Sequence, residues 1–166
     1  QLRSAVVQDG LPVIADALAP HSAPPAPSVV PHSAALAAAA NSVVKITGNA
    51  YQCGQNQSGS GFVVSPGRIV TNAHVVAGVS APVVEPRGGG AYQGRVVYFD
   101  PAHDLAVIAV SGLSTTPLPL GNNLAPGATG AFDGYPLGGP FQSGAATVQS
   151  VPTVEMKDIY GNNPEP

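Results

Sequence analysis

Charged side chains are scarce in this 166-residue sequence. Asp, Glu, Lys and Arg together make up 9% of the residues, and the formal net charge is −3. Proteins that bind a nucleic-acid backbone present a basic patch or stripe, and six Lys and Arg residues spread along the chain do not form one. The composition therefore argues against nucleic acid as a partner.

Cysteine, tryptophan and long apolar runs are also few or absent. The chain contains no tryptophan and a single cysteine, Cys53, which has no second cysteine in the chain with which to form a disulfide. No apolar run approaches the roughly 18 residues that indicate a membrane-spanning helix. No targeting signal is recognisable, which leaves the compartment open at this level of argument.

Glycine and proline, by contrast, are abundant. Twenty Gly and eighteen Pro argue against long helices and favour short strands joined by turns. Residues 1–41 are distinct: the proline-rich stretch 20–27 predicts an extended linker, and the alanine-rich stretch 33–41 predicts a short helix with Ser33 as its N-cap. From Ser42 onward, β-branched runs between turn residues predict strands, among them 105–110 and 145–151.

Two motifs at strand ends carry the chemistry. Thr-Asn-Ala-His, ending at His74, follows an apolar run, and His-Asp-Leu-Ala-Val-Ile begins at His103, so that Asp104 lies thirty positions after His74. Imidazole, with an unperturbed pKa near ~6.5, suits a general base for a serine hydroxyl, and a carboxylate behind it fixes its tautomer. Either residue alone would be read as a core histidine or a turn aspartate. The two motifs in this order favour a catalytic pair.

On these motifs the chain resembles the chymotrypsin-like (trypsin-fold) serine proteases. Within them it is most similar to the Thr-Asn-x-His branch that includes the periplasmic HtrA-type enzymes, and above all to the actinobacterial membrane-anchored acid-resistance periplasmic proteases. Further matching segments are 42–46, 58–63, 98–104 and 134–139. The resemblance implies an all-β fold of two perpendicular six-stranded barrels with the active site between them.

The resemblance also divides the chain. Residues 42–112 would form a first barrel that carries both His74 and Asp104. Residues 113–152 would form a connector and the start of a second barrel, and residues 153–166 an exposed tail.

The nucleophile of the family lies in Gly-Asp/Asn-Ser-Gly-Gly, and this motif does not occur in the 166 residues. Ser60 precedes His74 in a stretch that is structural in the family, and Ser143 lacks the motif, so we reject both as nucleophiles. We expect the N-terminal part of an extracytoplasmic serine endopeptidase, inactive without a C-terminal part that carries the serine. A nick after Pro166, a truncation and a disordered loop at that point all stay open.

Cys53 lies in a polar loop, where an idle cysteine is the plain interpretation. The resemblance instead implies a disulfide between Cys53 and the C-terminal part, an oxidising compartment, a membrane anchor upstream of the linker and a role in stress.

Three alternatives complete the sequence interpretation. His103 is a rival base, although its side chain should point away from that of its neighbour Asp104. A non-catalytic trypsin-fold module that binds a partner is an alternative function. The four histidines (His21, His32, His74 and His103) show no metal-ligand spacing, so we expect neither a metal nor a cofactor.

Overall fold

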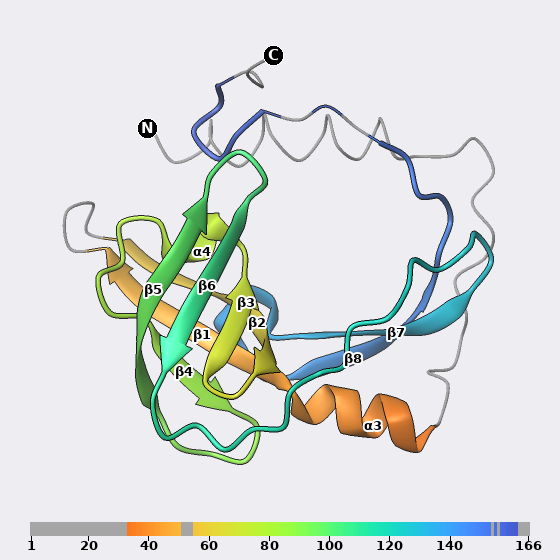
Figure 1. Ribbon diagram of the computed structural model, residues 1–166, viewed down its shortest axis with the longest axis horizontal. Coiled ribbons are helices and arrows are strands. Elements are labelled where there is room, and N and C mark those ends of the chain that lie inside the picture. Colours follow the sequence, from red (N-terminus) through yellow and green to blue (C-terminus); the bar gives the residue numbers. More distant parts are fainter. Residues whose placement is uncertain (1–32, 51–54, 154, 156, 163–166) are drawn as a thin grey trace.

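The computed structural model describes residues 33–50, 55–153, 155 and 157–162. This part of the chain forms a closed six-stranded barrel with a two-stranded sheet beside it (Figure 1). The elements, in chain order, are α3 (Ala34–Asn41), β1 (Val43–Ala50), β2 (Gln55–Ser65), β3 (Arg68–Thr71), α4 (Ala73–Val76), β4 (Val83–Pro86), β5 (Tyr92–Asp100), β6 (Leu105–Val110), β7 (Thr129–Gly134), η1 (Pro136–Gly138) and β8 (Gln142–Thr147).

The barrel closes because β1 pairs with a strand on each side. Its strand order is β1-β2-β3-β6-β5-β4, every pairing is antiparallel, and Val44 of β1 faces both Gly61 of β2 and Pro86 of β4. In β6 the residues Ala106, Ile108 and Val110 are buried and their neighbours are not, which is the two-residue alternation of a strand with one face on a core.

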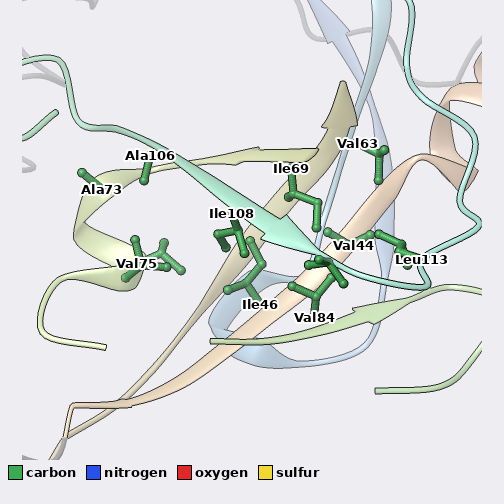
Figure 2. Packing of buried hydrophobic residues seen from close by; sticks show 12 residues of the cluster. Val44, Ile46, Val63, Ile69, Ala73, Val75, Val84, Ala106, Ile108 and Leu113 are labelled. Carbon is green, nitrogen blue, oxygen red and sulfur yellow. The ribbon is translucent and has the colours of Figure 1, made fainter. Parts of the chain in front are cut away.

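The barrel interior is filled by aliphatic side chains (Figure 2). Ile46, Ile69 and Ile108 are completely buried and belong to one hydrophobic cluster. A Cβ at Gly61 would lie 2.8 Å from the carbonyl oxygen of Val70, so only glycine allows β2 and β3 to approach this closely.

The second sheet is the β7–β8 hairpin, in which Thr129 pairs with Thr147 and Gly134 pairs with Gln142. The prediction of a strand over 145–151 is wrong in its bounds. The polar residues from Gln142 pair in register with β7, whereas Val148 bonds backbone atoms of the loop that precedes β7. The expected fold class is confirmed: an all-β chain with one complete barrel and the beginning of a second sheet.

The end of the described chain returns to the first barrel. It arches back towards the turn that joins the end of β5 to the start of β6 (Figure 1), where the Ile159 N–H donates to the Pro101 carbonyl (3.1 Å). Most described residues of the expected exposed tail are exposed, but Asp158 and Ile159 are half-buried and Ile159 packs against the barrel core. The reason is a turn capped by Asp158, whose carboxylate accepts from the backbone of Tyr160 and Asn162.

Candidate active site

His74 lies in α4, a single helical turn that follows β3 directly. Ala73, Val75 and Val76 are buried and anchor this turn on the barrel, whereas His74 is exposed. The sequence predicted a strand-to-loop transition here, and the helical turn was missed because four residues carry no measurable periodicity. Burial on both sides of His74 fixes its backbone and directs its imidazole out of the barrel.

Each carboxylate oxygen of Asp104 contacts one nitrogen of His74. Oδ1 accepts from the His74 backbone N–H (2.9 Å), and Oδ2 lies 2.8 Å from Nδ1 of the His74 ring. Asn72 holds Asp104 in turn, because its side-chain amide donates to Oδ2 and to the backbone carbonyl of Asp104, both at 3.1 Å. The structure thus brings together the two residues that the sequence singled out and adds Asn72, which the Thr-Asn-x-His motif already contained.

This contact determines what the imidazole can do. With the ring proton on Nδ1, the imidazole donates to Asp104, and Nε2 keeps a lone pair that can accept a proton. The side chain of His74 is 62% exposed and that of Asp104 is 32% exposed. An imidazole that is held through Nδ1 and open to solvent at Nε2 can accept the proton of a neighbouring hydroxyl when that hydroxyl acts as a nucleophile.

A second histidine–aspartate pair lies beside the first. Oδ2 of Asp100 is 2.8 Å from Nδ1 of His103, and Oδ1 accepts from the backbone N–H groups of Ala102 (3.0 Å) and His103 (3.1 Å). The hydrogen bond to His103 lowers the pKa of the Asp100 carboxyl below its usual value. The rival base of the sequence analysis is therefore paired with Asp100 and not with Asp104. Asp100 was missed, although its position at the start of Asp-Pro-x-His is typical of a capped turn.

The rejected serines have other surroundings. Oγ of Ser60 accepts from the Tyr135 backbone N–H (2.8 Å), and the Ser60 carbonyl accepts from the Thr71 hydroxyl (2.8 Å), so Ser60 connects the His74 segment to the loop after β7. Ser143 is exposed in β8. Cys53 lies outside the described residues.

Aromatic contacts fix the hairpin to the barrel. The rings of Tyr135 and Phe141 meet edge to face with centroids 5.6 Å apart, and the Arg87 guanidinium lies 4.0 Å above the Phe141 ring. Burial raises the pKa of the Tyr135 hydroxyl. These contacts hold the start of the second sheet against the first barrel.

Comparison with known proteins decides the family. Residues 59–163 match the model of the trypsin-like peptidase domain. The chain belongs to this family. This match confirms the resemblance to the trypsin-fold serine proteases that the sequence motifs indicated.

The relatives with established names are serine proteases, in agreement with the family match. The chain is 41% identical over 147 residues to serine protease Rv3671c of Mycobacterium tuberculosis (strain H37Rv), an alignment that covers 87% of this chain and 36% of the relative. The crystal structure of the active form of the Rv3671c protease matches with a TM-score of 0.74 and 37% identity, covering 87% of this chain and 66% of that chain.

A more distant structure shows the same fold. The HtrA-type protease AlgW with a tripeptide has a TM-score of 0.67 at 21% identity, and the alignment covers 78% of this chain and 51% of that chain.

The chain spans about a third (36%) of the length of its curated relative Rv3671c.

Across residues 33–50, 55–153, 155 and 157–162, no cluster of three or more His, Cys, Asp or Glu side chains could hold a metal ion. None of the helices in this described part combines the length and the apolar character that crossing a membrane requires.

Proposed function

We propose that this trypsin-like peptidase domain supplies the base and the orienting carboxylate of a serine endopeptidase, with His74 and Asp104 in these roles. The observation that carries the proposal is the double contact of Asp104 with the backbone N–H and the ring Nδ1 of His74. One carboxylate that binds both atoms leaves the imidazole little freedom to rotate. Serine proteases of this fold need such a fixed imidazole.

The proposed reaction is acyl transfer to water in two steps. Nε2 of His74 takes the proton of the serine hydroxyl as the oxygen attacks the peptide carbonyl, and returns it to the leaving amine to give an acyl-enzyme. A water molecule then loses a proton to Nε2 and attacks the ester, and Nε2 returns that proton to the serine oxygen as the acid is released. Asp104 stays ionised and stabilises the imidazolium in both steps.

The serine belongs, in this proposal, to a C-terminal part beyond Pro166, because the family motif does not occur in these 166 residues. Without the nucleophile and its oxyanion donors these residues alone would not hydrolyse peptides at a useful rate. The resemblance to the family also gives the proposed domain boundaries. Residues 42–112 form the first barrel, and residues 113–152 form a connector and the start of the second.

A fluorophosphonate probe on the intact protein tests this proposal. We expect the probe to label one serine C-terminal to Pro166 and the substitution His74→Ala to abolish labelling, because the hydroxyl then lacks its base. His103→Ala is the matched control and should still be labelled. Labelling that survives His74→Ala would refute the assignment of the base.

The absence of Gly-x-Ser-Gly-Gly from the sequence given also supports an alternative, a non-catalytic trypsin-fold module that binds a partner protein. The same experiment separates the two functions. Failure of the probe to label any serine of the intact, folded protein would favour the binding module.

We further propose an extracytoplasmic enzyme that acts on proteins of the cell envelope under stress, with a membrane anchor upstream of the Pro/Ala-rich residues 1–41. A disulfide between Cys53 and the C-terminal part would hold the two parts together, and such bonds typically contribute about 2–4 kcal/mol. Thiol titration of the intact protein with and without reductant tests this bond. A Cys53 thiol that reacts without reductant would refute it.

A further inference from the structure

The backbone of Asp104 has an unusual conformation. Its φ is +51°, and among the described residues only Leu137 is another non-glycine residue with positive φ. An L-residue in this left-handed region has a less favourable backbone energy than in the α or β region, although aspartate tolerates it better than most. Neighbouring contacts must therefore hold Asp104 in the one conformation from which its carboxylate reaches both atoms of His74.

Asp100 supplies contacts of this kind to the turn at 101–104. Its Oδ1 binds the two backbone N–H groups of Ala102 and His103, and its Oδ2 binds the His103 ring and accepts from the Tyr98 hydroxyl at 3.2 Å. The side chain of Asp100 is only 20% exposed, whereas that of His103 is 80% exposed. Asp100 is thus the fixed partner, and it determines the direction in which the chain enters Asp104.

The turn is also held from outside the barrel. The Ile159 N–H donates to the Pro101 carbonyl, and the Ile159 side chain packs against the barrel core. The turn at 101–104 is therefore held both by the Asp100 carboxylate and by the backbone N–H of Ile159. Nothing in this arrangement requires His103 to take part in proton transfer.

We infer that Asp100 is a positioning residue for the reaction, acting through Asp104 by fixing the turn between them. This inference rests on the proposed function. The hydrogen bonds of the Asp100 carboxylate go to Tyr98, Ala102 and His103 and not to His74. Small displacements of an oriented group are costly, since about 1 Å of misplacement can reduce a rate by about 10²-fold.

Two substitutions in the intact protein separate the turn from the charge. Asp100→Ala removes both acceptors, and we expect kcat to fall by about 10- to 100-fold with KM changed less than about twofold. Asp100→Asn keeps an oxygen for the two backbone N–H groups, and we expect it to restore kcat to within about threefold of the wild type. Ser33→Ala removes the side-chain cap of α3, which bonds the Leu36 N–H, and serves as a control that leaves kcat unchanged.

A spectroscopic measurement keeps the test independent of turnover. The proton shared by His74 Nδ1 and Asp104 should give a far-downfield NMR resonance in the wild type and in Asp100→Asn. This resonance should be absent from Asp100→Ala. Loss of kcat and of the resonance in the alanine variant alone supports the inference. An alanine variant that keeps both, or an asparagine variant as impaired as alanine, overturns it. An intact wild type that shows the resonance but no activity would refute the proposed function, and the resonance in the two variants would still decide the role of Asp100.

Discussion

Replacing Asp104 by asparagine is the sharpest perturbation of the candidate site, because it replaces one carboxylate oxygen by an NH₂ group without changing the shape of the side chain. In the wild type, Oδ1 accepts from the His74 backbone N–H, and Oδ2 faces the His74 ring and the amide of Asn72. In Asp104→Asn the one remaining oxygen stays with the backbone N–H, which cannot move away. The new NH₂ group then faces Nδ1 of His74 and the NH₂ of Asn72.

Two consequences follow from this geometry. The NH₂ group can only donate, so Nδ1 must become an acceptor and the ring proton moves to Nε2, where it blocks the lone pair that the proposed serine nucleophile needs. The amide of Asn72 also loses its acceptor on that side. A wrong tautomer of this kind lowers kcat by about 10⁴-fold in serine proteases, which corresponds to about 5 kcal/mol of activation free energy.

Peptide hydrolysis by the intact protein measures the effect, with Glu85→Gln as the control. That control makes the same carboxylate-to-amide change at the half-buried pair between Glu85 and Lys45, where the two charged groups are 4.0 Å apart. The ¹⁵N chemical shifts of His74 report the tautomer directly. An Asp104→Asn variant that retains more than a tenth of wild-type turnover, with the proton still on Nδ1, would refute the reasoning.

Three further predictions concern stability. Ile108→Ala should lower the free energy of unfolding by about 2–5 kcal/mol in urea titrations, while Val97→Ala, at a side chain that is 42% exposed, should change it by less than about 0.5 kcal/mol. Gly61→Ala should lower the melting temperature because its Cβ would meet a β3 carbonyl, whereas Gly88→Ala, which has open space around it, should not; equal melting temperatures would contradict the packing argument. The Asn162 side chain lowers the pKa of Asp158, so the stability from this carboxylate is complete above about pH 4 and is lost as the pH falls through the lowered value. The stability difference between wild type and Asp158→Asn should therefore be constant above about pH 4 and shrink below it, and a constant difference in acid would count against the turn.

The sequence predicted the pairing of His74 with Asp104 better than it predicted the residues around this pair. His74 and Asp104 could be singled out because each lies in a local motif at a strand end, and a barrel brings such ends together. The alternation of buried residues in β6 likewise shows in the sequence, because burial on one face of a strand is a local pattern.

The parts that could not be predicted depend on distant contacts. The capping of the 101–104 turn by Asp100 requires knowing that the chain turns there. The hydrogen bond from Ile159 to Pro101 joins residues that are separated in the chain by β6, the connector and both strands of the second sheet. No local pattern specifies the partner in such a contact, so the support of the 101–104 turn by Asp100 and Ile159 emerges only from the three-dimensional structure.

Closure of the barrel has a consequence for how the chain is made. Every barrel strand has a partner on both sides, whereas within the described residues β7 and β8 pair only with each other. A ribosome that releases the chain from its N-terminal end would thus deliver a finished first unit before the second is complete. The outer backbone groups of the ribbon would meanwhile attract any extended polypeptide, and crowded nascent chains would aggregate through β7 and β8 and not through the barrel.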